Sequence, residues 1–262
     1  AKADAIYHRS NQGGGEWEYR RRLPEKWKIS CGEGEDKLVL TGIADRVDGW
    51  LHEGKLYLRV VDYKTGRKKF DLSDVLYGMN LQMLLYLFSL GENGKLLYGE
   101  EIVPAGVLYV PARDGVISED GDISDAELEK KRSKGLRRSG LVLSDPEVIR
   151  AMEHADTPKY IPVDFKKNGP AGDALVSAER LGTLARHIDQ TLCEMASELR
   201  RGSIAADPYY AGQQENACIN CDYFDACRFA DGENGESMRS TPHLPATKVW
   251  SVLEGGGEDG EV

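Results

Sequence analysis

Alternating apolar and polar positions dominate the first part of the chain and predict β-strands. The clearest candidates are residues 37–48 and 55–64, where apolar side chains recur at every second position, as a pleated strand requires. Residues 16–22 and 27–30 are shorter candidates. The stretch 52–54 separates the two clearest strands and ends in a glycine, which readily adopts the positive φ of a tight turn. The pattern therefore predicts a run of strands joined by short turns.

Apolar positions spaced three and four residues apart then predict two long helices. The first begins near Asp71 or Ser73, either of which can cap it, and reaches Leu90, with Gly94 in the loop beyond its end. The second runs from about residue 172 to 201, and the glycine that follows is a natural stop. Its expected apolar stripe consists of Leu175, Ala178, Leu181, Leu184, Ile188, Leu192, Met195 and Leu199.

The other segments carry weaker patterns. Residues 106–110 predict a short apolar strand that ends at a proline, and residues 112–172 are polar and irregular with one basic block. We expect residues 1–15 to be a linker, residues 16–230 to form one domain, and residues 231–262 to be a flexible acidic tail. The interior thus combines strands and helices in one α/β domain.

The charge balance at first argues against a nucleic-acid partner. The chain has 34 Lys plus Arg against 44 Asp plus Glu, a formal net charge of −10, whereas nucleic-acid-binding domains usually carry net positive charge. However, residues 231–262 alone hold seven acidic and two basic residues. Basic residues also cluster at 20–22, 67–69 and 130–138, and such patches can hold phosphates, although each is equally typical of a solvated surface. No run of 18 apolar residues predicts a membrane span.

Carboxylates and one lysine suggest a site at the end of the strongest strand. Asp62 and Lys64 lie two residues apart, so their side chains point to the same face of that strand. Asp45 ends a neighbouring stretch, and it converges with Asp62 if the two strands pair in antiparallel fashion. Two adjacent carboxylates repel unless a cation lies between them, and Mg²⁺ suits such ligands. The pattern alone fits a metal site and a surface ion pair equally well.

Asp48 is a rival to Asp45 as the second carboxylate. It lies three residues further along the chain, an odd number, so its side chain should point to the opposite face of the strand. We therefore take Asp45 as the candidate ligand and Asp48 as a residue of an ion pair or a turn.

Three of the five cysteines form a compact group, Cys218, Cys221 and Cys227, in a Cys-x2-Cys-x5-Cys pattern. An odd number of cysteines in a chain of this length argues against a secreted disulfide scaffold. The spacing favours part of a zinc or iron–sulfur site in a reducing compartment, so we expect a cytoplasmic protein. Of the two other cysteines, Cys31 lies in a strand–turn region and Cys193 flanks an apolar stripe, as a small core residue does.

The carboxylate motifs, taken in order, resemble a known family. Residues 42–48 read Gly-Ile-Ala-Asp-Arg-Val-Asp, residues 62–66 read Asp-Tyr-Lys-Thr-Gly, and Gln82 precedes Tyr86 by four positions. This series is similar to the motifs of the RecB-type branch of the PD-(D/E)XK nucleases. The resemblance implies a restriction-endonuclease-like α/β fold, a mixed central sheet flanked by helices with the active site at a sheet edge. The resemblance further implies a Mg²⁺- or Mn²⁺-dependent nuclease.

The resemblance also assigns roles to residues. The catalytic residues it implies are Asp45, Asp62, Lys64, Gln82 and Tyr86. The implied metal ligands are Asp45, Asp62 and the backbone carbonyl of Tyr63. Relatives carry a further His or Glu on an upstream helix, for which this chain offers only His8, Glu16 and Glu18, none in a convincing helix.

The cysteine segment resembles the C-terminal iron–sulfur segment of AddB subunits of AddAB (RexAB)-type helicase–nucleases. The preceding Asp-Pro-Tyr-Tyr at 207–210 and the following Arg-Phe at 228–229 fit the same pattern, and the resemblance extends over about residues 16–229. It implies a 4Fe-4S cluster with Cys218, Cys221 and Cys227 as three of four ligands. The fourth cysteine lies upstream in the family, so we expect this chain to be the C-terminal nuclease domain of a longer subunit.

The resemblance implies an exonuclease that hydrolyses one strand, the 5′-ended one, at DNA double-strand ends during recombinational repair. The implied partners are DNA, as a single strand or a duplex end, and an AddA-type subunit. The basic residues best placed to hold DNA are Arg67, Lys68 and Lys69, which directly follow the catalytic strand. Two alternatives stay open: a catalytically weak DNA-binding and assembly module held together by the cluster, and a zinc-ribbon-type binding domain.

Overall fold

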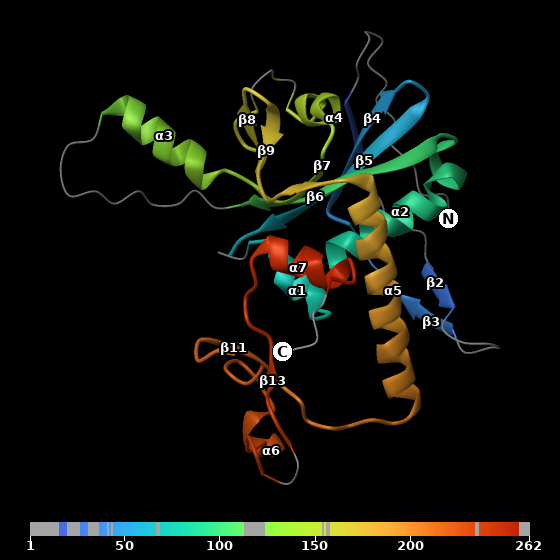
Figure 1. Ribbon diagram of the computed structural model, residues 1–262, viewed down its shortest axis with the longest axis vertical. Coiled ribbons are helices and arrows are strands. Elements are labelled where there is room, and N and C mark those ends of the chain that lie inside the picture. The colour runs from blue at the N-terminus through green and yellow to red at the C-terminus, as the bar shows by residue number, and fades with distance from the viewer. Residues whose placement is uncertain are drawn as a thin grey trace. The chain divides into compact units, whose positions relative to one another are not determined.

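The structure is a computed structural model in which the chain divides into two compact units (Figure 1). The first unit comprises Ala1–Lys28, Val39–Phe70 and Leu81–Ala185, and the second Ile29–Leu38, Asp71–Asn80 and Arg186–Val262. The described residues are 16–19, 27–30, 37–40, 42, 44–66, 69–112, 124–153, 155, 158–233 and 236–256.

A six-stranded mixed sheet forms the centre of the first unit, in the order β1-β4-β5-β6-β7-β10. Strands β5 and β6 are parallel, as are β7 and β10, and the other neighbouring pairs are antiparallel. The strands are β1 (Glu16–Tyr19), β4 (Arg46–His52), β5 (Lys55–Lys64), β6 (Glu101–Pro111), β7 (Ser139–Leu143) and β10 (Leu175–Val176).

The hairpin β4–β5 carries the two strands that hold most of the predicted site. Glu53 and Gly54 connect them with φ values of 48° and 74°. Positive φ at both central residues matches the right-handed twist of the flanking strands, which favours such two-residue turns. Strand β5 spans residues 55–64 as predicted, whereas the predicted strand 37–48 is divided between β3 (Lys37–Leu40) and β4. Strand β3 instead pairs with β2 (Trp27–Ser30).

The first predicted helix is two helices, α1 (Leu72–Leu76) and α2 (Gln82–Tyr98). Gly78 and Asn80 between them have φ values of 77° and 53°, which a right-handed helix does not accommodate. Helix α2 also continues through Gly94, which the sequence placed in a loop. A Cβ atom at Gly94 would lie 2.5 Å from Ile102 Cγ1, so the glycine allows close contact between helix and sheet.

Helices cover both faces of this sheet. Gly91 and Gly94 of α2 approach Pro104 and Ile102 of β6, which pair with Leu58 and Leu56 of β5. Helix α2 therefore covers the face to which even-numbered β5 residues point, including Asp62 and Lys64. Helix α4 (Pro146–Ala151) lies on the other face, where Arg59 Nη1 donates a hydrogen bond of 2.8 Å to the carbonyl of Met152. This arrangement confirms the predicted mixed sheet flanked by helices.

The segment 112–172, predicted as irregular, contains five elements among its described residues. The short apolar run of β7 is buried from Gly140 to Leu143 but gives too little periodicity to be recognised in the sequence. Helix α3 begins with a capping box between Ser124 and Glu127. The elements are α3 (Asp125–Gly135), β7, α4, β8 (Asp164–Lys166) and β9 (Gly169–Ala171).

Helix α5 (Ala178–Arg200) begins six residues later than predicted, because Leu175 belongs to β10. Leu181, Leu184, Ile188 and Leu192 of the predicted stripe are buried, whereas Met195 and Leu199 are exposed. The second unit further contains β11 (Tyr209–Gly212), β12 (Glu215–Asn216), α6 (Phe224–Cys227), β13 (Arg239–Ser240) and α7 (Ala246–Leu253).

The prediction of a flexible tail from residue 231 is wrong for residues 239–253, which include β13 and α7. Val249 and Trp250 of α7 are buried, and this apolar anchor outweighs the acidic composition on which the prediction depended. None of the helices among the described residues has the length and apolar character needed to cross a lipid bilayer.

Candidate active site

Asp45 and Asp62 meet at one end of the β4–β5 hairpin. Arg46, the first residue of β4, pairs with Val61 in the antiparallel register, so Asp45 immediately precedes β4 at the level of Asp62. The backbone N–H of Tyr63 donates a hydrogen bond of 3.3 Å to Asp45 Oδ2, which holds the Asp45 carboxylate beside the end of β5. The convergence predicted from the sequence is therefore present in the structure.

Asp62 and Lys64 form an ion pair between Oδ2 and Nζ. The Asp62 side chain is only 14% exposed, and its Oδ2 accepts no geometrically acceptable hydrogen bond among the described residues. The ion pair is therefore a close contact of charges without good hydrogen-bond geometry. A desolvated carboxylate oxygen held in this way is a strong potential ligand for a cation.

Tyr109 completes the surroundings of Lys64 and was not identified from the sequence. It pairs with Asp62 in the parallel β5–β6 register, and Lys64 Nζ lies 4.7 Å from the centroid of its ring. Phe70 supports the ring at a centroid distance of 6.2 Å. The ammonium of Lys64 thus lies near both a carboxylate and an aromatic face, and the latter contact alone contributes about 0.5–2 kcal/mol in proteins.

Gln82, Tyr86 and Gly42 also come together. Gln82 Nε2 donates a hydrogen bond of 2.9 Å to the Tyr86 hydroxyl, as expected for residues four apart on a helix. A Cβ atom at Gly42 would lie 2.6 Å from the same hydroxyl oxygen, so the glycine leaves room for the tyrosine ring. The two motifs that the resemblance linked are therefore in contact in the first unit.

Asp48 lies on the other face of the sheet, as its odd spacing from Asp45 predicted. It is buried and accepts hydrogen bonds from Arg46 Nε at 2.5 Å and Arg59 Nε at 2.8 Å. Its oxygens are thereby engaged by two guanidinium groups, which makes Asp48 part of an ion-pair network.

Several candidate residues have no described contact with the site. His8, Arg67 and Lys68 lie outside the described residues, as do the side chains of Glu16 and Glu18. Lys69 is exposed. The predicted roles of these residues therefore stay predictions.

The chemistry of the donors at Asp45 and Asp62 fits a divalent cation. The described residues contain no group of three or more His, Cys, Asp or Glu side chains arranged to hold a metal ion. Mg²⁺, however, is commonly bound by only one or two carboxylates, with water and phosphate oxygens as the remaining ligands. The two aspartates and the backbone carbonyl of Tyr63 meet that requirement, and the desolvated Oδ2 of Asp62 provides a ligand atom.

The cysteine segment belongs to the second unit. Cys218 is half-buried, Cys221 and Cys227 are exposed, and all three are free thiols. The backbone turns tightly here, since Cys221 N–H donates to Cys218 O at 3.3 Å and Cys227 N–H to Tyr223 O at 2.8 Å. The described residues contain no group of three or more His, Cys, Asp or Glu side chains placed to hold a metal ion, so no chemical step is assigned to a cluster here.

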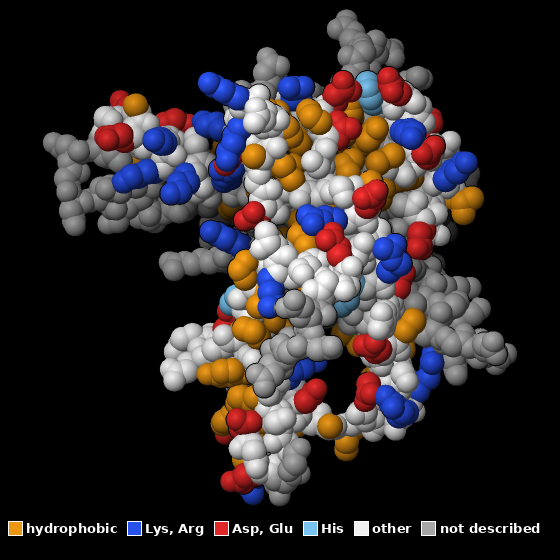
Figure 2. Space-filling view, viewed as in Figure 1, with side chains coloured by type: hydrophobic (Ala, Val, Ile, Leu, Met, Phe, Trp, Pro, Cys, Tyr) orange, Lys and Arg blue, Asp and Glu red, His pale blue; other side chains and the backbone are white. Residues whose placement is uncertain are grey.

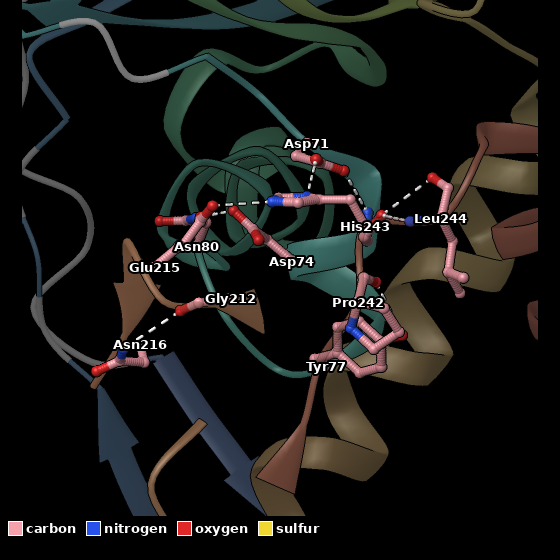
Figure 3. Close-up of polar contacts among 11 residues, drawn as sticks. Asp71, Asp74, Tyr77, Asn80, Gly212, Glu215, Asn216, Pro242, His243 and Leu244 are labelled. Carbon is pink, nitrogen blue, oxygen red and sulfur yellow. Dashed lines mark hydrogen bonds and ion pairs between the residues drawn. The ribbon is translucent and has the colours of Figure 1, made fainter. Parts of the chain in front are cut away.

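His243 connects three segments of the second unit (Figure 3). Its Nδ1 lies 2.7 Å from Asp71 Oδ2, at the start of α1, and its Nε2 lies 2.9 Å from Glu215 Oε2, three residues before the first clustered cysteine. The neighbouring Leu244 N–H donates to Ser73 Oγ at 2.9 Å. Hydrogen bonds to Glu215 and then Asp71 raise the pKa of His243, because the two carboxylates favour the charged imidazolium.

The His243 contact predicts a modest pH-dependent stabilisation. A raised pKa in the folded state means that the stabilisation is present below about pH 6.5, the unfolded value, and is lost as the pH rises through the folded pKa. Because the groups are partly exposed, we expect His243→Gln to lower Tm by at most about 2–4 °C at pH 6. Thermal unfolding at pH 6 and pH 9 measures this difference. An unchanged difference at pH 9 would show that charge is not its origin.

The sequence of the chain is similar to proteins of a known family. A family model described as the PD-(D/E)XK nuclease superfamily matches residues 7–228. The chain is 34% identical over 221 residues to the B-type subunit of an ATP-dependent helicase/deoxyribonuclease of Clostridium acetobutylicum, covering 83% of this chain and 19% of the relative. It is 36% identical over 234 residues to the corresponding protein of Caldanaerobacter subterraneus subsp. tengcongensis, covering 87% and 20%. The chain thus spans about a fifth of the length of the curated relatives it matches, and it belongs to the PD-(D/E)XK nuclease superfamily.

Proposed function

We propose that the chain is the metal-dependent deoxyribonuclease domain of a helicase–nuclease subunit and hydrolyses phosphodiester bonds of a single DNA strand. The observation that carries this proposal is the position of the Asp45 carboxylate at the end of β5, where it accepts a hydrogen bond of 3.3 Å from Tyr63 N–H next to the Asp62–Lys64 ion pair. Relatives named as deoxyribonuclease subunits support DNA as the substrate.

The side chains have separable roles in this proposal. Asp45, Asp62 and the Tyr63 carbonyl would hold Mg²⁺ or Mn²⁺, which when bound supplies the Lewis acidity that polarises a phosphodiester. The Lys64 ammonium, positioned by Asp62 and the Tyr109 ring, would orient the attacking water or offset the negative charge that develops on the phosphate. Gln82 and Tyr86, joined by their hydrogen bond, lie on the helix that covers this face of the sheet.

The resemblance of the sequence motifs to AddB subunits supports a wider setting, and the relatives' names support a helicase–nuclease subunit. We propose an exonuclease that acts on the 5′-ended strand at DNA double-strand ends for recombinational repair, in the cytoplasm and with an AddA-type partner. The three clustered cysteines support, by their spacing, a 4Fe-4S cluster in the intact subunit, which iron analysis of that subunit tests.

A chelation experiment on the intact helicase–nuclease complex tests the proposed reaction. We expect degradation of a single strand labelled at either end to stop in excess EDTA and to resume when Mg²⁺ is restored, because the two carboxylates need a cation to act on a phosphodiester. The order in which label is released from the two ends reports the polarity. Degradation of the 5′-ended strand that persists undiminished in EDTA would contradict the proposal.

A further inference from the structure

Helix α3 is an arm of the first unit that contributes nothing to its core. None of its residues is buried, and in Figure 1 it projects to the side of the sheet. An isolated helix of fewer than about 12 residues is only marginally stable in water, even with a good cap. Helix α3 has 11 residues and a capping box. An exposed element of this kind is expected to gain stability from a partner.

The residues on either side of the segment that contains α3 lie at the same end of the sheet as Asp62 and Lys64. Before it, Ala112 N–H donates to Lys64 O at 2.9 Å. After it, Ser139 pairs with Tyr109, and its hydroxyl accepts a hydrogen bond of 3.0 Å from Phe70 N–H. Lys134 precedes Ser139 by five residues, so it lies within about 18 Å of that edge even if the chain between them is fully extended.

Three lysines cluster on one side of α3. At about 100° per residue, Lys130, Lys131 and Lys134 share one face of the helix, here called the basic face. Glu127 lies on the same face, whereas Glu129 and Arg132 lie on roughly the opposite side, so the basic face keeps a net positive charge. An ion pair of 3.2 Å joins Glu129 to Lys159 of the same unit. This contact turns the basic face away from Lys159. Figure 2 shows Lys and Arg side chains gathered along this arm and at its base.

The two arginines that follow the helix do not belong to this face. Arg137 forms an ion pair of 2.5 Å with Asp164, and Arg138 is half-buried. Lys130, Lys131 and Lys134 are exposed. An apolar partner would not cover three lysines, whereas a chain of phosphates would neutralise them and release counterions.

We propose that the basic face of α3 binds the backbone of single-stranded DNA as it leads to or from the active site. This inference rests on the proposed nuclease function, because the arm is anchored at that site's edge. Binding would depend on phosphate charge with little dependence on base sequence. A strand spanning both the active site and α3 needs several nucleotides, within the roughly 4–16 that single-strand grooves commonly cover.

A binding experiment on the 262-residue chain tests the proposal with a matched control. Fluorescence anisotropy measures affinity for a labelled 20-nucleotide oligothymidine in EDTA, where no hydrolysis occurs. Lys130→Gln/Lys134→Gln removes two charges from the basic face without touching a buried residue. Lys55→Gln/Lys95→Gln removes the same charge from exposed residues, with Lys55 at the opposite end of β5.

Each phosphate contact on a single strand contributes about 0.7 to the slope of log affinity against log salt. For the α3 variant we therefore expect the slope to fall by about 1.4 and the affinity at 0.1 M salt to fall roughly 25-fold. The control should stay within about twofold, because its lysines lie outside the path of the strand.

Equal effects of the two double variants would overturn the proposal, because net charge would then explain both. Unchanged affinity of the α3 variant, or no measurable binding by the wild-type chain, would overturn it as well. Unchanged DNA binding together with a lost contact to a partner subunit would assign α3 to an acidic protein surface instead. DNA binding by α3 is measured without divalent cations. Its outcome is therefore independent of whether the chelation experiment supports the proposed nuclease function.

Discussion

Replacing Asp62 by Asn is expected to reduce metal-dependent DNA hydrolysis by at least roughly 10²–10³-fold, with the fold retained. Its desolvated Oδ2 forms an ion pair with Lys64 but accepts no hydrogen bond from the described residues. The carboxylate can therefore also bind a divalent cation, whereas an amide supplies only a neutral oxygen. Lys64→Ala should cause a loss of similar size, since it removes the ammonium that Asp62 and Tyr109 position. Single-turnover hydrolysis of a labelled strand by the complex measures both losses.

Metal binding gives a readout that does not depend on activity. For the wild-type chain, Mg²⁺ at about 100 times its Kd should raise the free energy of unfolding by about 2.7 kcal/mol, and Asp62→Asn should lose most of this gain. Asp173→Asn makes the same chemical change at an exposed position and should behave as wild type in both assays. Full activity in a folded Asp62→Asn variant would exclude Asp62 from catalysis.

The side-chain periodicity of a strand made the core of this site predictable. Because successive residues point to opposite faces, the sequence alone placed Asp62 and Lys64 together and separated Asp45 from Asp48. The structure agrees on both points, with the Asp62–Lys64 ion pair on one face and the Asp48–Arg59 pair on the other.

Features that depend on long-range register or local backbone strain were not predictable. Tyr109 reaches Lys64 only because the β5–β6 register shifts between Leu58 and Arg59, and no local pattern signals that irregularity. The break between α1 and α2 interrupts a continuous helical spacing of apolar residues. Asn80 adopts a positive φ there, and nothing in the neighbouring sequence predicts it. Helix α7 was missed because an acidic, glycine-containing context concealed its two buried residues, Val249 and Trp250.

Substitutions of Asp45 and Asp48 should have different effects: loss of Asp48 should lower stability, and loss of Asp45 should lower activity. Asp48 and Arg59 are 4% and 6% exposed, and the pair is joined at 2.7 Å. Removing one partner of a buried ion pair leaves the other charge desolvated and uncompensated. We therefore expect Asp48→Ala to lower the free energy of unfolding by about 3–5 kcal/mol, measured by urea denaturation at pH 7.

The surroundings of Asp48 make a large effect reasonable. Arg46 also donates a hydrogen bond to its carboxylate, so two guanidinium groups depend on the charge of Asp48. Arg59 would retain its hydrogen bond to the Met152 carbonyl, which limits but does not replace the lost countercharge.

Asp45→Ala is the matched comparison, since Asp45 is exposed and accepts one long hydrogen bond from Tyr63 N–H. We expect a stability change within about 1 kcal/mol, together with a loss of hydrolysis comparable to that of Asp62→Asn. Asp48→Ala should show the reverse, with hydrolysis per folded molecule close to wild type because Asp48 lies behind the sheet. A buried carboxylate that is paired with two arginines cannot contact the substrate without first breaking its ion pairs. If Asp48→Ala abolished hydrolysis but left the protein as stable as wild type, the structural role assigned to Asp48 would therefore be wrong.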